Sequence, residues 1–167
     1  MTDFQNLVIA PLNPTHGTGF QCGVEALDRY LKMQAKQDVK RRISRVFVAT
    51  MADNPKAAIG YYTLSTLSIE LNQLPEKLAR KLPKHPGPAA LIGRLAVSNV
   101  AQGQGVGKML LADAIKRTLA VSDQIAIYAI VVDAINENAK EFYEQFGFTR
   151  LSDDSPRLFL PLKSINL

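Results

Sequence analysis

The stretch VSNVAQGQGVGKML, residues 97–110, holds Gly103, Gly105 and Gly107 directly before an apolar run. Glycine has no Cβ, so it adopts backbone conformations closed to other residues and lets a ligand come close to the main chain. When such a loop opens a helix, its N–H groups and the positive end of the helix dipole can bind an anion such as pyrophosphate. The alternative is a turn that only reverses the chain.

Two other glycine-rich nucleotide loops are disfavoured. A Walker loop needs G-x-x-x-x-G-K followed by Ser or Thr, but Lys108 is followed by Met109, and the place of the first glycine is taken by Gln102. A Rossmann loop normally lies in the first strand–helix unit of a parallel sheet, whereas this loop follows four predicted strands.

The hydrophobic pattern predicts an alternating α/β chain without repeats. In KMLLADAIKRTLA, apolar residues recur at the spacing of one helix face. IAIYAIVVDA is nearly continuous and β-branched, which is typical of a central strand buried on both faces. The pattern predicts an α/β (mixed α+β) fold, a mixed sheet covered by helices. The predicted strands lie near 7–11, 45–51, 57–67, 89–98, 125–134 and 156–162, and the helices near 24–40, 105–120 and 136–146, with a short helical or irregular piece at 74–82.

Length and composition narrow the class of protein. A chain of 167 residues, 47% of them hydrophobic, is the usual size of one domain, which we expect to span residues 1–167. The longest apolar stretch, Ile125 to Val132, is far shorter than the roughly 20 residues of a membrane span, and the N-terminus does not read as a signal peptide. We therefore expect a cytoplasmic protein that does not enter the membrane. A single cysteine and two isolated histidines predict neither a disulfide nor a metal site.

Positive charge gathers on one predicted helix. Its apolar residues, Val24, Leu27, Leu31 and Ala35, fall on one side at 100° per residue, and its basic residues fall on the other. The basic residues continue past the end of the helix, and the segment from Arg29 to Arg45 contains a single acid, Asp38. Most such faces are only solvated, but a nearly single-signed one can follow RNA phosphates. The basic residues are Arg29, Lys32, Lys36, Lys40, Arg41, Arg42 and Arg45.

Two segments carry a family resemblance. LAVSNVAQGQGVGKMLLADAI resembles the acyl-CoA-binding motif Q/R-x-x-G-x-G/A of the GNAT acetyltransferases, with Gln102, Gly105 and Gly107 at the motif positions. NENAKEFYEQFGF is similar to the second signature of the family, and carries Asn136, Ala139, Tyr143 and the pair Gly147-Phe148. The resemblance implies a GNAT-like, mostly antiparallel sheet flanked by helices.

A subgroup resembles the chain more closely, namely the GNAT toxins of bacterial toxin–antitoxin pairs. FQCGVEALDRYLKMQAKQD, IGYYTLSTLSIE and LPKHPGPAALIGRLAV are all similar to that subgroup's pattern. The resemblance implies acetylation of the amino acid on a charged tRNA by acetyl-CoA, which blocks translation. It also implies inhibition by a ribbon-helix-helix antitoxin, and a homodimer.

The same resemblance implies site residues. The acetyl carbonyl would face backbone amides of Leu95, Ala96 and Val97, and Asn136 would belong to the cofactor site. Tyr143 would protonate the departing sulfur. An α-amine has a pKa of about 7.7–8.0, so much of it is already neutral near pH 7–8 and the reaction does not demand a strong side-chain base; whether one exists stays open. The pyrophosphate would lie on the amides of Gln102, Gly103, Gln104, Gly105, Val106, Gly107 and Lys108.

Several residues keep a second interpretation. Tyr143 shares an amphipathic helix with Phe142 and Phe146, so it could be a core aromatic. Arg94, inside a predicted strand, must reach solvent, an anionic ligand such as RNA, or a carboxylate such as that of Asp133. Cys22 is predicted to be a small buried residue rather than a reactive thiol.

Two segments and two other functions also remain open. PKHPGP, with three prolines in six residues, is predicted to be irregular, as a connector or a wall of the acceptor site. His85 within it has no predicted role. The alternative functions are a GNAT enzyme for a small amine or a protein N-terminus, and a non-catalytic acyl-CoA-binding regulator.

Overall fold

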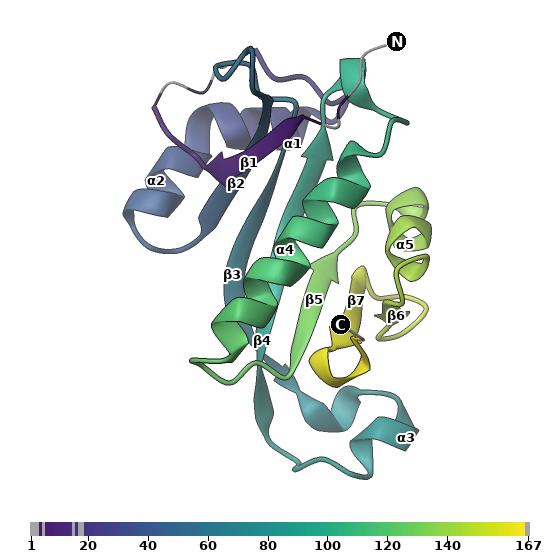
Figure 1. Ribbon diagram of the computed structural model, residues 1–167. Helices are drawn as coiled ribbons and strands as arrows, with labels where there is room; N and C mark the ends of the chain where they lie inside the picture. Colours follow the sequence, from purple (N-terminus) through teal and green to yellow (C-terminus); the bar gives the residue numbers. More distant parts are fainter. Residues whose placement is uncertain (1–3, 5, 15, 17–18, 166–167) are drawn as a thin grey trace. The chain divides into compact units, whose positions relative to one another are not determined.

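Seven strands form a mixed sheet in a computed structural model that describes residues 4, 6–14, 16 and 19–165 (Figure 1). Their order is β1-β2-β3-β4-β5-β7-β6. β4 and β5 pair in parallel, whereas β1–β2, β2–β3, β5–β7 and β6–β7 are antiparallel. The prediction of a mixed, mostly antiparallel sheet is confirmed. The strands are β1 Leu7–Pro11, β2 Arg45–Met51, β3 Gly60–Glu70, β4 Pro86–Val97, β5 Ala129–Asp133, β6 Thr149–Arg150 and β7 Arg157–Pro161.

All three predicted long helices are present. The first is divided into α1 Glu25–Arg29, a π-helical turn η1 Tyr30–Gln34, and α2 Ala35–Lys40. The second is α4 Val106–Ser122 and the third is α5 Glu137–Glu144. The short piece near 74–82 contains α3 Glu76–Ala79. Single 3-10 turns lie at Leu71–Gln73, Asn99–Ala101 and Leu162–Ser164.

The chain divides into two compact units, residues 1–65 with 93–116, and residues 66–92 with 117–167. The expectation of one domain stays a prediction. No helix among the described residues is long and apolar enough to cross a membrane.

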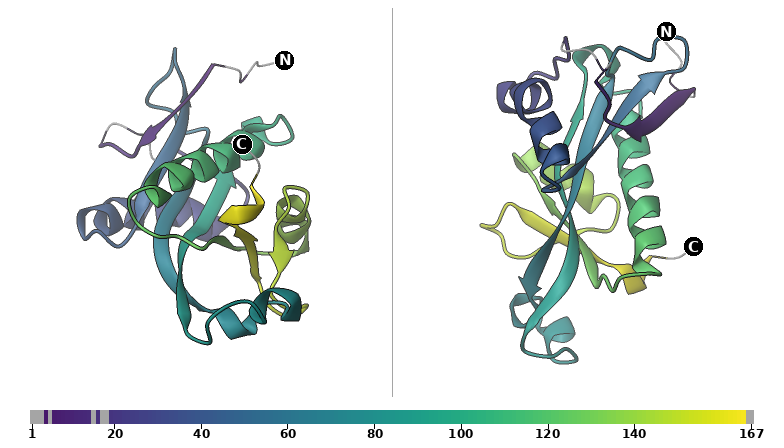
Figure 2. Two further views of the ribbon diagram at one scale, coloured as in Figure 1. Left: turned by 60° about the horizontal axis from the view of Figure 1, so that its bottom comes forward. Right: turned by 90° about the vertical axis from the view of Figure 1, so that its left-hand side faces the viewer.

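In the first unit, the side chains of neighbouring β3 residues point to opposite faces of the sheet, as strand geometry requires. The hydroxyl of Tyr61, which is fully buried, donates to the carbonyl of Leu27 in α1 at 2.6 Å. The hydroxyl of Tyr62 donates to Asp113 of α4 at 2.6 Å. Figure 2 shows α1 and α2 on one side of these strands and α4 on the other. A Cβ on Gly60 would lie 2.9 Å from the carbonyl of Ala96, so only glycine lets this packing form.

The end of α2 is unusual because its left-handed residue is an arginine. Arg42 has φ 61°, and its N–H donates to the carbonyl of Val39, while Ile43 N–H donates to that of Asp38. This is a Schellman motif, whose left-handed position glycine usually fills. A residue with a Cβ costs about 1–2 kcal/mol there.

In the second unit, β5 is the buried centre. Ala129 to Val132 are fully buried, and they pair with Ala89 to Ile92 of β4 on one side and with β7 on the other. The predicted start of this strand at residue 125 was wrong. The N–H of Ile125 still donates to the carbonyl of Val121 at 3.0 Å in the turn after α4, and its side chain is exposed.

Other element boundaries also differ from the prediction. The expectation that PKHPGP is irregular was wrong for its second half, because β4 begins at Pro86 and the carbonyl of Pro88 accepts from Tyr128 N–H at 2.8 Å. Proline lacks only the donor of a strand residue, so it is tolerated at a strand's start. β3 begins at Gly60 rather than 57 and continues to Glu70. β6 was missed because two residues are too few to show alternation.

Candidate active site

The glycine loop lies between β4 and α4, as predicted. After the 3-10 turn Asn99–Ala101 the chain passes through Gly103 at φ 76° and Gly105 at φ 87°, and α4 begins at Val106. A Cβ at Gly103 or Gly105 would meet nothing within 4 Å. Glycine is therefore required here by backbone conformation, and the space beside the loop stays open to a ligand.

Gln102 fixes the start of this loop. Its side-chain Nε2 donates to the carbonyl of Cys22 at 2.7 Å and to that of Val97 at 2.9 Å. Gln104, by contrast, has only a 3.5 Å contact from its Nε2 to the carbonyl of Val100. The side chain of Gln102 thus holds the loop against the end of β4, which leaves the backbone to bind a ligand.

The loop residues fit a pyrophosphate. The first N–H groups of a helix have no acceptor within the helix, and in α4 the amide of Met109, which donates to the carbonyl of Gly105 at 3.1 Å, is the first to find one. Amides at Val106, Gly107 and Lys108 precede it, and the side chain of Lys108 is exposed. Donors at a helix N-terminus together with a cation suit an anion. Among the described residues, no group of three or more His, Cys, Asp or Glu could hold a metal ion.

The β4 residues Leu95, Ala96 and Val97 lie directly before this loop. The carbonyl of Val97 accepts from Gln102, and the next amide, that of Ser98, donates to Ile59 at 2.7 Å. The strand end is thus firmly held. A contact of its amides with an acetyl group stays a prediction.

Tyr143 packs as a core aromatic in the second unit. It lies on α5, whose N-cap Asn136 accepts from the N–H of Ala139 at 2.9 Å. Its ring lies 5.3 Å from that of Phe142 and 5.6 Å from that of Phe148, and only 4% of the residue is exposed. Burial, with a smaller effect from the Asp133 carboxylate, raises the pKa of Tyr143 above its ordinary value. The hydroxyl therefore keeps its proton at neutral pH.

The hydroxyl of Tyr143 is not fully buried. No fully buried side-chain oxygen or nitrogen among the described residues lacks a hydrogen-bond partner. The Tyr143 hydroxyl has no such partner within that part of the chain, so its oxygen reaches solvent. The packing interpretation of the ring is thus correct, and the role of the hydroxyl as a proton donor stays a prediction.

The predicted faces of the first helix are confirmed. Leu27, Leu31 and Ala35 are buried, together with Tyr30, which lies three residues after Leu27 on the same side, and the predicted Val24 is half-buried against the same cluster. Cys22, just before this helix, is also buried, and burial followed by the Asp28 side chain raises its pKa to about 11. All seven basic residues from Arg29 to Arg45 are exposed; we call them the basic stripe.

Acids offset little of the basic stripe. Arg29 pairs with Glu25 at 2.6 Å. Asp38 accepts from the Tyr30 hydroxyl at 2.8 Å and from Gln34 Nε2 at 2.9 Å. An exposed, nearly single-signed surface remains.

Arg94 has an aromatic partner that the sequence did not reveal. Its guanidinium carbon lies 3.6 Å from the centre of the Tyr30 ring. The acid considered for it, Asp133, accepts instead from Nε of Arg157 at 3.0 Å. Tyr30 and Arg157 were both missed, because neither position carries a motif.

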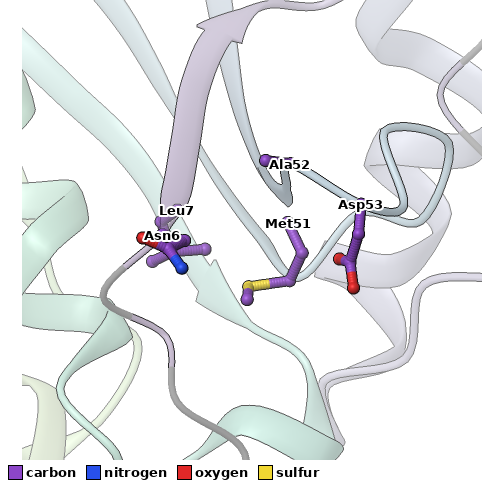
Figure 3. Close-up of a pocket in the computed structure, with 5 residues that line it drawn as sticks. All are labelled: Asn6, Leu7, Met51, Ala52 and Asp53. Atoms are coloured by element: carbon purple, nitrogen blue, oxygen red, sulfur yellow. The ribbon is translucent and has the colours of Figure 1, made fainter.

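A pocket of about 500 Å³ lies where β1 begins and β2 ends (Figure 3). Asn6 and Leu7 line one side of it, and Met51, Ala52 and Asp53 line the other. These residues offer a carboxylate and no cation, so the pocket does not suit a phosphate.

Known proteins share both sequence and fold with this chain. Residues 84–159 match the acetyltransferase (GNAT) domain family. The chain is 36% identical over 146 residues to the tRNA-acetylating toxin of Mycobacterium tuberculosis, which covers 87% of this chain and 86% of the relative. The chain belongs to the GNAT acetyltransferases, among their toxins. It is an N-acetyltransferase that takes its acetyl group from acetyl-CoA.

Solved structures of GNAT toxins agree along nearly the whole chain. A KacT mutant with one Tyr-to-Phe exchange has a TM-score of 0.91 at 35% identity, with 96% of this chain and 97% of that one covered. AtaT in complex with acetyl-methionyl-tRNAfMet has a TM-score of 0.88 at 31% identity, with 95% and 96% covered. AtaT has also been solved with the C-terminus of the antitoxin AtaR and acetyl-CoA.

Proposed function

We propose that this protein is a toxin that acetylates the α-amino group of the amino acid on a charged tRNA and thereby blocks translation. The observation that carries the proposal is an exposed, nearly single-signed basic stripe on a chain 36% identical to a tRNA-acetylating toxin. A small cationic amine would instead favour an acidic acceptor site.

The glycine loop would hold the cofactor. Backbone amides from Gln102 to Lys108 would bind the pyrophosphate, and those of Leu95 to Val97 would polarise the acetyl carbonyl. Asn136, the N-cap of α5, would belong to the cofactor site, as the family resemblance implies. When bound, acetyl-CoA supplies the acetyl group as a thioester.

Tyr143 would act as the general acid. The amine nitrogen would attack the carbonyl carbon as the C–S bond breaks, and Oη of Tyr143 would give its proton to the departing sulfur. The amine would lose its own proton to water, and water would return a proton to Tyr143. One observation supports this role: structures of Tyr-to-Phe mutants of both KacT and AtaT have been solved.

The basic stripe would follow the RNA. Lysine and arginine side chains bind phosphates regardless of sequence, so the stripe would position the tRNA and leave the choice of amino acid to the acceptor site. The complex of AtaT with acetyl-methionyl-tRNAfMet supports an RNA of this class.

Partners and compartment complete the proposal. A ribbon-helix-helix antitoxin would inhibit the enzyme, by analogy with AtaT bound to the C-terminus of AtaR. We further propose a homodimer that acts in the cytoplasm.

Expression without an antitoxin tests the proposal. Wild-type protein should stop bacterial growth and leave N-acetylated aminoacyl-tRNA, detected by mass spectrometry of nuclease-digested RNA. Tyr143→Phe should permit growth and lower turnover about 10²–10⁴-fold, the usual value of general-acid assistance. Tyr128→Phe, at a half-buried tyrosine of the same unit, is the matched control and should remain toxic.

Two outcomes would contradict the proposal. In the first, the wild type is harmless and leaves tRNA unmodified, yet releases free thiol from acetyl-CoA when polyamines are added. Such a protein would be a small-amine acetyltransferase. A Tyr143→Phe variant that stays equally fast excludes this hydroxyl as the acid.

A further inference from the structure

Arg94 carries a guanidinium without a salt bridge among the described residues, although the pKa of the nearby Asp38 carboxyl is lowered by the hydrogen bond from Gln34 and, to a smaller extent, by Arg94 itself. It is half-buried on β4, and among the described residues no carboxylate forms a salt bridge with it within 4.0 Å. One face of the guanidinium lies on the Tyr30 ring at 3.6 Å. Because no fully buried side-chain nitrogen in that part of the chain is without a partner, the donors of Arg94 reach solvent.

Tyr30 is itself held from two directions. Its ring stacks on that of the buried Tyr61, with centroids 6.2 Å apart and an angle of 17° between the planes. Its hydroxyl donates to Asp38 at 2.8 Å, and Asp38 also accepts from Gln34 at 2.9 Å. Tyr30 opens the π turn, a deviation from α-helix that often occurs at functional sites.

The strand alternation places Arg94 on the face of the sheet that α1 and α2 cover. Arg94 and Ala96 are two residues apart on β4 and therefore point to one face. Ala96 packs in one cluster with Tyr30, Leu31 and Tyr61, under α1 and α2. In this unit α4 covers the opposite face, through Tyr62 and Asp113. Arg94 therefore lies on the side of the sheet that α1 and α2 cover, away from the face covered by α4.

We propose that Arg94 binds a phosphate of the RNA substrate, and that Tyr30 is a positioning residue that fixes the plane of its guanidinium. This inference rests on the proposed function and adds a defined contact to it. A guanidinium binds two phosphate oxygens only when its plane is correctly oriented, and stacking on a held ring sets that plane before the RNA arrives. A lysine cannot replace it, because an ammonium has neither a fork nor a flat face.

The first test is Arg94→Gln, assayed with aminoacyl-tRNA over a salt series. The KM for aminoacyl-tRNA should rise about tenfold or more, because a hydrogen bond to a charged group is lost. The slope of log affinity for deacylated tRNA against log salt should fall by about one. The KM for acetyl-CoA should not change. Arg80→Gln is the matched control, since Arg80 is an exposed arginine already paired with Glu76 at 2.6 Å.

The second test is a double-mutant cycle. Tyr30→Phe keeps the ring but removes its bond to Asp38, so the KM for aminoacyl-tRNA should rise about threefold, less than for Arg94→Gln. In the Arg94→Gln background the same exchange should have no further effect. If Tyr30→Phe fails to fold, Gln34→Ala, at an exposed residue, weakens the same support of Asp38 and replaces it.

The outcomes separate this inference from the proposed function. Multiplicative effects of the two exchanges would show that Tyr30 does not act through Arg94. An unchanged tRNA affinity and salt slope in Arg94→Gln would overturn the phosphate contact, and a raised KM for acetyl-CoA alone would assign the phosphate to the cofactor. A wild type that binds tRNA with the predicted dependence on Arg94 but does not acetylate it would overturn only the proposed reaction.

Discussion

The side-chain amide of Gln102 donates a 2.7 Å hydrogen bond to the main-chain carbonyl of Cys22, 80 positions earlier in the chain. A second bond, to Val97, ties the same amide to the end of β4. The glycine loop is thus anchored at its first residue, although the glycines that follow give it conformational freedom.

Loss of this anchor should weaken cofactor binding. Gln102→Ala removes both bonds, which at about 0.5–1.5 kcal/mol each should lower the stability by roughly 1–3 kcal/mol. The affinity for acetyl-CoA should fall about tenfold, because the loop must be ordered when the ligand binds. Calorimetry gives both numbers. Gln104→Ala is the control, and an equal loss of affinity there would show that the anchor is not specific.

A carboxylate in the loop should abolish cofactor binding. Gly105→Glu forces a side chain into a left-handed conformation and places a negative charge where the amides would face phosphate. Gly105→Ala carries the same backbone cost of about 1–2 kcal/mol without the charge, and nothing lies within 4 Å of its new Cβ. We expect Ala to retain measurable acetyl-CoA binding and Glu to retain none. If both folded variants bound acetyl-CoA with the same affinity, the negative charge of the glutamate would not be the cause of any loss.

Replacing three lysines of the basic stripe should weaken RNA binding. Lys32, Lys36 and Lys40 changed together to Ala should lower the slope of log affinity against log salt by about two to three, and leave acetyl-CoA affinity unaltered. The matched triple replaces the exposed Lys77, Lys81 and Lys84, so that the net charge changes equally. Filter binding with deacylated tRNA measures both. If both triple variants show the same salt slope for tRNA binding, the basic stripe is a solvated surface that does not bind RNA.

Cys22 should resist thiol reagents in the folded protein. Its pKa of about 11 means that it stays a thiol at pH 8 and becomes a thiolate only well above that pH. Since the thiolate is the reactive form, labelling at pH 8 should be about 10²-fold slower than for an ordinary cysteine. The rate should recover in denaturant. Fast labelling of the native protein would contradict the burial of this side chain.

Local patterns predicted much of the fold and part of the site. The glycines before α4, the periodicity of α1–α2 and the apolar run of β5 each act over a few neighbouring residues, so the sequence shows them directly. The motif around Tyr143 was also visible, together with its packing against Phe142.

The remaining features depend on contacts between distant residues. The stack of Arg94 on Tyr30 joins a strand to a helix, and no spacing rule connects the two positions. The bond from Gln102 to Cys22 is of the same kind. The π-helical turn Tyr30–Gln34 has no characteristic amino-acid composition. The helical periodicity of the sequence therefore predicted one continuous helix in place of α1, the π turn and α2.

The left-handed Arg42 at the end of α2 should affect thermal stability and toxicity in opposite directions. Exchange of Arg42 for glycine should relieve about 1–2 kcal/mol of backbone cost and raise the melting temperature, while it deletes one charge from the basic stripe, which we propose binds RNA. The variant with the higher melting temperature would then be the less toxic one. Selection for toxicity can thus retain a residue that selection for stability alone would discard.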